Sequence, residues 1–308
     1  MFFILLTALM FNVFILLIQR VAKRPAFPAI WTVFLPLARG AQAKMNKAGR
    51  SRQDIIFRGF LAYIFVLFAA VAIYFLLEGL RYAALTEDAM VLIYGFVLAL
   101  CSSPFFYLGQ FDLEKLAKGV GLSLSHLDNA GQQRFRLLIT TQMYVFAFLT
   151  PVFWLYILGI GGCLFASITL AMAMVAGKYG HHNGFSTVPN TLAFLLTLIP
   201  NIGGTFIFLI VSAFTPGFKI YGGLRAITSW NKAPHFLQGG WPLLVLARAS
   251  GYTLGGSLRD SENVILKNDW VGNAKETANI PQKKQKNFLF FFVLATLLAV
   301  LILAAFLL

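Results

Sequence analysis

Long stretches without a charged residue dominate this sequence and constrain its fold more than any other feature. Phe288–Leu308 holds 21 uncharged residues, and Leu137–Ala176 holds forty. A helix needs roughly 20 apolar residues to cross a bilayer, and lipid offers no hydrogen-bond partners to an irregular backbone. Only 12% of the chain is charged, against about a quarter in soluble domains. The sequence therefore predicts an all-α, polytopic membrane protein rather than a soluble helical protein with a very large core.

Six apolar runs are long enough to be membrane spans if the forty-residue run is counted once. They are Met1–Ile18, Gly59–Leu77, Ala89–Leu108, Leu137–Ala176, Val188–Phe214 and Phe288–Leu308. The first lacks a basic start and a small-residue cleavage pattern, so we interpret it as a retained span. The forty-residue run exceeds one tilted span, and its excess is an overhang, a re-entrant piece or a second short span. Such a span would turn at Gly159, Gly161 and Gly162, and Pro151 is expected to kink or break the run.

The basic residues are divided unevenly between the connecting segments. All but two of the 25 Lys and Arg residues, Arg81 and Lys178, lie in Gln19–Arg58, Gly109–Arg136 and Thr215–Asn287. Loops rich in Lys and Arg stay on the cytoplasmic side. We therefore expect a multi-pass protein of a cell inner membrane, with both termini outside and the three basic loops cytoplasmic.

The chain is interpreted as a single integral membrane domain, residues 1–308, with segment 215–287 as a helical cytoplasmic loop between the last two spans. A net charge of +14 would suggest nucleic acid in a soluble protein. Here it reflects topology and attraction to anionic lipid, so the bilayer is the expected partner and nucleic acid is not. No span centre holds an acidic or basic residue, which counts against an ion-coupled carrier but leaves a neutral pore open.

Short motifs for catalysis or metal binding are scarce. His181 and His182 are adjacent, so on a helix they would point about 100° apart, and no third ligand lies in their loop. His126 near Asp128 fits an ordinary surface histidine. Cys101 and Cys163 lie inside apolar runs and fit small core residues. We expect no metal site from these residues.

The segment Gly239–Gly272 is the part of the chain most suited to a binding site. Gly240-Trp241-Pro242 sets a turn before an apolar helix, and Leu254-Gly255-Gly256 allows close backbone approach. Trp270-Val271-Gly272 adds an interfacial aromatic residue beside another flexible point. The alternative reading of each motif is structural: a turn, a cap and a membrane-surface tryptophan.

The order of these motifs resembles the C-terminal half of the adenosylcobinamide-phosphate synthase family. The resemblance continues upstream in Pro25-Ala26-Phe27-Pro28, Leu127-Asp128, Thr150-Pro151-Val152-Phe153-Trp154 and Val188-Pro189-Asn190. That family forms the amide bond between an aminopropanol-type arm and cobyric acid, in the membrane, with ATP and a divalent cation. The resemblance implies ATP and Mg as cofactors, and a cobyric acid derivative as substrate, only if the activity is retained.

The chain departs from the family where the family carries acidic residues. The positions of an Ala-Glu-Asn and a following Asp are occupied by Thr141–Phe146. An Asp-Asp pair corresponds to Asn183–Thr187, and a Gly-Arg-Asp-Thr corresponds to Gly121–Ser125. Of those signature acids only Asp128 remains, although activation of a carboxylate by ATP needs acids to hold the cation. A resemblance in fold does not by itself imply that the chain has the activity of the family.

A second branch of the superfamily, inner-membrane proteins linked to the regulation of β-lactamase induction, also lacks the synthase acids. The basic linker Gln282–Lys286 before the last span resembles that branch, whereas the retained Gly-Trp-Pro and Leu-Gly-Gly motifs do not. The chain is therefore interpreted as a decayed offshoot of the superfamily.

Three functions are consistent with these patterns. The preferred one is a catalytically silent superfamily member that acts as a membrane regulator or binds a membrane or cytoplasmic protein. The second is a working synthase whose acids converge on a cytoplasmic pocket with Arg248 or Arg259. Its candidate acids are Asp128, Asp260, Glu262, Asp269 and Glu276. The third is a transporter or channel.

We expect a cytoplasmic substrate-binding groove with a floor of Pro151 and Trp154 and a roof of Trp241, Gly255, Gly256 and Trp270. The candidate site residues are Asp128, Pro151, Trp154, Trp241, Pro242, Gly255, Gly256 and Trp270. The competing interpretation is that these residues only pack the protein and anchor it at the membrane surface.

Overall fold

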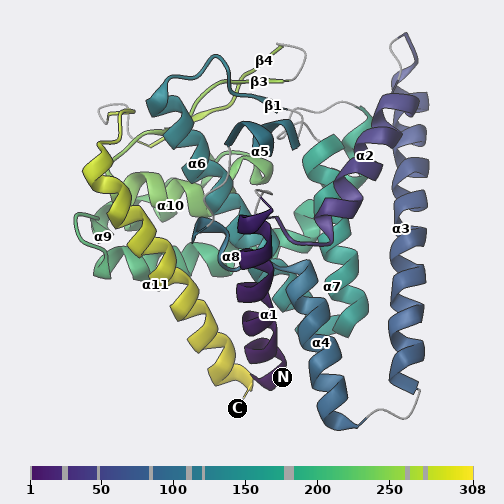
Figure 1. Ribbon diagram of the computed structural model, residues 1–308. Helices are drawn as coiled ribbons and strands as arrows, with labels where there is room; N and C mark the ends of the chain where they lie inside the picture. The colour runs from purple at the N-terminus through teal and green to yellow at the C-terminus, as the bar shows by residue number, and fades with distance from the viewer. Residues whose placement is uncertain are drawn as a thin grey trace. The chain divides into compact units, whose positions relative to one another are not determined.

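The computed structural model describes residues 2–22, 27–46, 49–82, 86–108, 113–119, 122–176, 184–260, 264–272 and 277–307 (Figure 1). It is mostly helical, at 79%. The chain forms two compact units. Unit 1 comprises Met1–Phe105 and Phe146–Thr197, and unit 2 comprises Phe106–Val145 and Leu198–Leu308.

Helices form most of both units. The α-helices are α1 (Phe2–Val21), α2 (Trp31–Met45), α3 (Arg52–Tyr82), α4 (Glu87–Cys101), α5 (Leu113–Gly119), α6 (Asn129–Tyr144), α7 (Thr150–Ala176), α8 (Thr187–Phe214), α9 (Ile220–Thr228), α10 (Gly240–Ser250) and α11 (Gln282–Leu307). A π-helical turn, η2 (Val145–Leu149), joins α6 to α7. Short 3₁₀ turns are η1 (Phe106–Leu108), η4 (Gly184–Ser186), η5 (Trp230–Lys232) and η6 (Phe236–Gln238).

Within the described residues, five helical segments are long and apolar enough to cross a membrane, which indicates a multi-pass membrane protein. They are Phe2–Val21, Arg52–Gly79, Asn129–Val175, Gly184–Phe214 and Lys284–Ala305. The predicted third span, Ala89–Leu108, differs: its helix α4 ends at Cys101 after 15 residues. Ser102, the C-cap, is extended. Pro104 lies two residues later and disfavours helical geometry at Ser103, the residue before it. Pro200, in contrast, does not end α8.

Pro151 leaves a carbonyl of its own helix without the usual donor. A helical proline cannot hydrogen-bond the carbonyl four residues earlier, which here is that of Ala147. The backbone N–H of Ser103 donates to this carbonyl instead, at 2.6 Å. The expected disturbance at Pro151 thus takes the form of the π-helical turn η2 and a hydrogen bond from another part of unit 1. The hydrogen bond to the Ala147 carbonyl matters because an unpaired backbone group inside lipid costs several kcal/mol.

The chain reverses direction at Gly159, inside the segment assigned to α7. This glycine has φ 65° and ψ −155°, a conformation that is essentially restricted to glycine. A Cβ on Gly162 would lie 2.7 Å from the carbonyl oxygen of Trp154, eight residues earlier. In a straight helix these positions would be about 12 Å apart along the axis. The structure therefore shows a turn at Gly159 and excludes a straight overhanging helix, whereas the choice between a re-entrant piece and a second short span stays a prediction.

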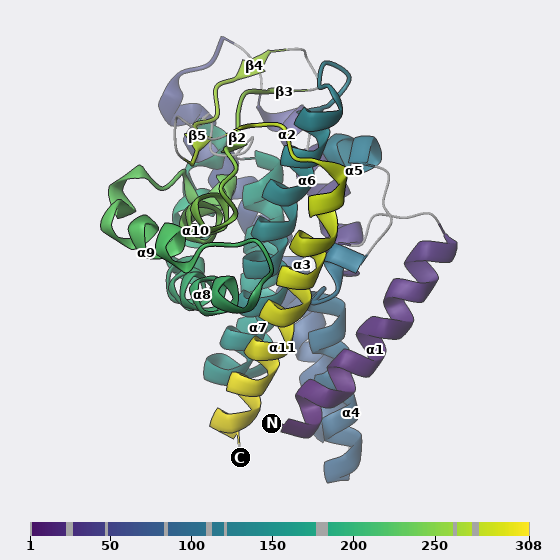
Figure 2. The same ribbon diagram turned by 90° about the vertical axis from the view of Figure 1, so that its left-hand side faces the viewer.

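Buried polar side chains link the helices of unit 1. α1 lies beside α4 in both views (Figures 1 and 2), and Asn12 Nδ2 donates to Ser102 Oγ at 3.1 Å. Trp31 Nε1 donates to Ser167 Oγ at 2.9 Å, which joins α2 to α7. The Tyr63 and Thr169 hydroxyls, on α3 and α7, are 2.8 Å apart. Each pair satisfies groups that would otherwise be desolvated without a partner.

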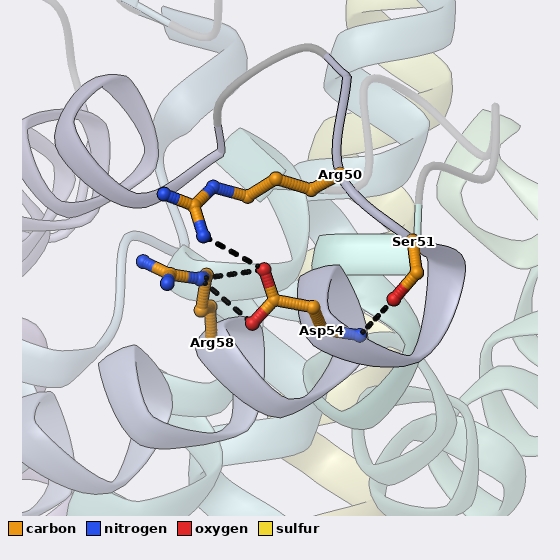
Figure 3. A network of polar contacts seen from close by, with 4 residues as sticks. All are labelled: Arg50, Ser51, Asp54 and Arg58. Carbon is orange, nitrogen blue, oxygen red and sulfur yellow. Dashed lines mark hydrogen bonds and ion pairs between the residues drawn. The ribbon is translucent and has the colours of Figure 1, made fainter.

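The first turn of α3 carries a small charged network (Figure 3). Arg58 Nε lies 3.0 Å from both carboxylate oxygens of Asp54, and Arg50 Nη1 lies 3.0 Å from Oδ2. Ser51 Oγ accepts from the Asp54 backbone N–H at 3.2 Å. These side chains are about a third exposed, and surface ion pairs contribute only about 0–1 kcal/mol each. The network therefore orders the start of α3 without adding much stability.

In unit 2, the C-terminal half of α6 packs against α11 and η6. The Tyr144 hydroxyl donates to the carbonyl of Ala295 in α11 at 2.8 Å, and Gln142 Nε2 donates to the carbonyl of Leu237 at 2.7 Å. Both side chains are buried. They show that the second half of α6 is a packed structural element.

Two small antiparallel sheets lie at the end of unit 2 where α6 and α11 begin (Figure 2). One has the strand order β1-β3-β4 and the other pairs β2 with β5. The strands are β1 (Leu122–Ser123), β2 (Leu254–Gly255), β3 (Leu258–Asp260), β4 (Ile265–Leu266) and β5 (Trp270–Val271). The sequence pattern did not indicate these strands, because each is only two or three residues long.

Candidate functional site

The Leu-Gly-Gly and Trp-x-Gly motifs are brought together as paired strands. Gly255 lies opposite Trp270, and Leu254 lies opposite Val271. Gly256 has φ 94°, and a Cβ there would lie 2.9 Å from carbons of the Trp270 ring. A larger residue at 256 would therefore displace the indole. Gly255 is restricted in the same way, since its Cβ would lie 2.5 Å from the Asp269 carbonyl oxygen.

Arg134 of α6 completes this arrangement, which we call the Trp270 platform (Arg134, Gly255, Gly256 and Trp270). Its guanidinium carbon is 5.1 Å from the centroid of the Trp270 ring. Nη1 donates to the Ala278 carbonyl at 2.9 Å, and the buried Nε has no hydrogen-bond partner within the described residues. A cation–π contact of this kind contributes about 0.5–2 kcal/mol. The platform thus places an exposed tryptophan, with Trp270 56% accessible, beside a positive charge.

The platform borders a cavity of about 170 Å³ between the first turns of α6 and strand β2. Leu127 and Phe135 form apolar parts of its wall. Asp128 lies beside it as the N-cap of α6, and Asp128 Oδ1 accepts from the Gly131 N–H at 2.7 Å. Asp128 therefore has a structural role, and its predicted part in substrate binding stays a prediction. Arg134 was not among the residues predicted from the sequence, where its only signal is a cation six residues after the retained Leu127-Asp128.

Trp241 and Pro242 begin α10, elsewhere in unit 2. The Trp241 ring packs on Trp230, with ring centroids 4.1 Å apart. Gly240, with φ 54°, lies against the side chain of Asn201. The Gly-Trp-Pro motif thus starts a buried helix, as the turn interpretation expected, and it does not line the cavity beside Trp270.

Pro151 and Trp154, the predicted floor of the groove, belong to unit 1 and have structural roles there. Trp154 Nε1 donates to the carbonyl of Leu196 at 2.8 Å. That carbonyl lies four residues before Pro200, which has no N–H to donate to it. Trp154 therefore supplies the hydrogen bond that Pro200 cannot donate to the Leu196 carbonyl. The Ser103 N–H does the same for the Ala147 carbonyl, which Pro151 cannot pair. A ligand-binding role for the two residues stays a prediction.

Replacing Trp154 with phenylalanine tests this structural role. We expect the free energy of unfolding to fall by about 1–2 kcal/mol, because the Leu196 carbonyl loses its donor. The measurement is the thermal unfolding midpoint of the detergent-solubilised chain, followed by circular dichroism. Trp230→Phe is the matched control, since the Trp230 indole makes no hydrogen bond among the described residues. Equal midpoints for the two variants would contradict the assignment.

The acids proposed for a working synthase do not gather in the described part of the chain. Asp260 is buried on β3, where Oδ1 accepts from the Val264 N–H at 2.9 Å. Asp269 is exposed beside the platform. No group of three or more His, Cys, Asp and Glu suited to a metal ion occurs among the described residues. Glu262, Glu276, His181, His182, Lys178 and Pro25 lie outside the described residues.

His126 precedes α6, near strand β3. Burial lowers the pKa of His126, and the Arg259 guanidinium lowers it further. The imidazole is therefore neutral at neutral pH and adds no charge to this end of unit 2.

These observations define a helical multi-pass membrane protein with a small platform of paired strands at one end of unit 2. No protein-family model, curated protein or solved structure matches the chain.

Proposed function

We propose that this chain is an inner-membrane member of the adenosylcobinamide-phosphate synthase superfamily that no longer forms the amide bond. It would act as a membrane regulator or partner, and it would bind through the Trp270 platform. The residues at the family's acidic positions support this proposal. At one of these positions, Thr141–Phe146, the residues are neutral and buried, and Gln142 and Tyr144 make packing contacts.

Restoring a carboxylate at position 141 or 142 would place it in a buried environment. Thr141 and Gln142 are at most 1% exposed, and burying an unpaired carboxylate costs several kcal/mol. A cation would also need several oxygen ligands. The burial of positions 141 and 142 therefore supports the proposed loss of the synthase chemistry.

An activity assay tests the proposal. The purified full chain is incubated with a cobyric acid derivative, an aminopropanol-type amine, ATP and Mg²⁺, and the products are analysed by mass spectrometry. We expect no amide product, and deletion of the gene should not cause cobalamin auxotrophy. Formation of the amide, or auxotrophy on deletion, would overturn the proposal in favour of the working synthase. A working synthase of the same superfamily serves as the positive control.

The proposed topology has a separate test by thiol labelling of intact cells. The proposal places Lys267 in the cytoplasm and Glu87 outside, and both side chains are exposed. We expect a membrane-impermeant reagent to modify Glu87→Cys in intact cells and Lys267→Cys only after the membrane is opened. The two native cysteines are buried, so the unsubstituted chain gives the background. Modification of Lys267→Cys in intact cells would refute a cytoplasmic platform.

A further inference from the structure

A second cavity of unit 2, of about 360 Å³, lies between α6 and the first turns of α11. Its polar lining includes Gln133, Arg136 and Lys286, and its apolar lining includes Leu289 and Phe292. No acidic residue lines it in the part of the chain that the structure describes. The stacked rings of Tyr107 and Phe292, 6.1 Å apart, form part of its wall. The cavity therefore combines two basic side chains with an apolar surface.

The two cations lie at the same level of the paired helices. The hydrogen bond from Tyr144 to Ala295 aligns α6 with α11. Arg136 precedes Tyr144 by eight residues and Lys286 precedes Ala295 by nine, and both helices begin at the same end of unit 2 (Figure 1). Beyond each cation the sequence carries no charge for the rest of its helix. Both helices thus change from polar to apolar at one level, as a membrane–water boundary requires.

The apolar part of the cavity extends toward the bilayer from this level. Phe292 is six residues after Lys286, which corresponds to about 9 Å along a helix. That separation suits a ligand with an anionic group at the boundary and a hydrocarbon chain below it. A free phosphate would use only the basic end of the cavity.

Gln133 supplies a further polar feature on α6. Its Oε1 is buried and has no hydrogen-bond partner within the described residues. An amide oxygen only accepts hydrogen bonds, so it needs a donor such as a hydroxyl group. A headgroup with a phosphate and hydroxyls, such as glycerol phosphate, complements both this acceptor and the two cations.

We propose that this cavity binds an anionic phospholipid. Arg136 and Lys286 contact the lipid phosphate, Gln133 accepts a hydrogen bond from a headgroup hydroxyl, and an acyl chain lies along Leu289 and Phe292. The inference does not depend on the proposed loss of synthase activity, since the cavity shares no residue with the Trp270 platform.

Native mass spectrometry of the full chain in detergent tests the proposal. The protein is titrated with phosphatidylglycerol or phosphatidylcholine of the same acyl chains, and the bound lipid is counted. We expect a preference for phosphatidylglycerol that weakens about fivefold in Arg136→Gln and in Lys286→Gln, because each basic residue contributes about 1 kcal/mol at an anionic lipid surface. Lys284→Gln is the matched control, since Lys284 lies on the same helix but does not line the cavity.

The remaining outcomes each contradict the proposal. Equal binding of the two lipids would show a site that does not sense charge. A loss with Lys284→Gln equal to that with Lys286→Gln would show a diffuse surface effect. Displacement of phosphatidylglycerol by inorganic phosphate at equal concentration would show that the ligand is a free anion. Arg136 and Lys286 are exposed, and the thermal midpoint of each variant is measured alongside, so that a loss of lipid preference is scored only in folded protein.

Discussion

Gly159→Ala should lower the free energy of unfolding by about 2–3 kcal/mol, because alanine cannot adopt the backbone conformation of Gly159 without strain. A Cβ at this position would meet no atom within 4 Å. The effect would therefore arise from the backbone alone and not from crowding. The measurement is the thermal unfolding midpoint in detergent, followed by circular dichroism.

Gly161→Ala is the matched control for this prediction. Its Cβ would lie 3.4 Å from the Tyr74 ring, an ordinary contact, and Gly161 has no left-handed backbone conformation. We expect Gly161→Ala to leave the midpoint nearly unchanged. If Gly159→Ala proved as stable as Gly161→Ala, the chain would not reverse at Gly159, and residues 150–176 would form one continuous helix.

Gly59→Ala should destabilise unit 1 by about 2–3 kcal/mol, at the upper end of the cost of overpacking. Its Cβ would lie 2.7 Å from the carbonyl carbon of Phe185 and even closer to the oxygen. The atoms in the way belong to the main chain, so no side-chain rotation relieves the clash. Pro189 has no N–H for the Phe185 carbonyl, and the close approach of Gly59 allows a weak Cα–H···O contact with it.

Gly79→Ala in the same helix α3 serves as the comparison, since a Cβ at Gly79 would meet nothing within 4 Å. That variant should be neutral or slightly more stable, because alanine favours the helix over glycine. The difference between the two midpoints isolates the contact with η4 from any general effect on α3. Similar midpoints would mean that α3 does not pack on Phe185.

Sequence patterns predicted the candidate site only in part. The motifs containing Gly255, Gly256 and Trp270 were identified because glycine and tryptophan are distinctive near a membrane surface. Their pairing as strands, and the position of Arg134 on the indole, were not evident. Arg134 and Trp270 are far apart in the sequence, and no local preference records that they meet. Trp154 was selected for its motif, and only the structure shows that its indole hydrogen-bonds the Leu196 carbonyl.

The sequence by itself determined the class of this protein and the approximate position of its first and last membrane helices. Transfer of a residue into lipid depends mainly on that residue, so uncharged runs such as Phe288–Leu308 indicate a span without reference to any neighbour. The tertiary structure alone decided the reversal at Gly159, the shortened helix α4 and the donors to the carbonyls before Pro151 and Pro200. These features depend on which distant segments of the chain lie beside one another. Hydrogen bonds between such segments produce no periodic pattern of residues in the sequence.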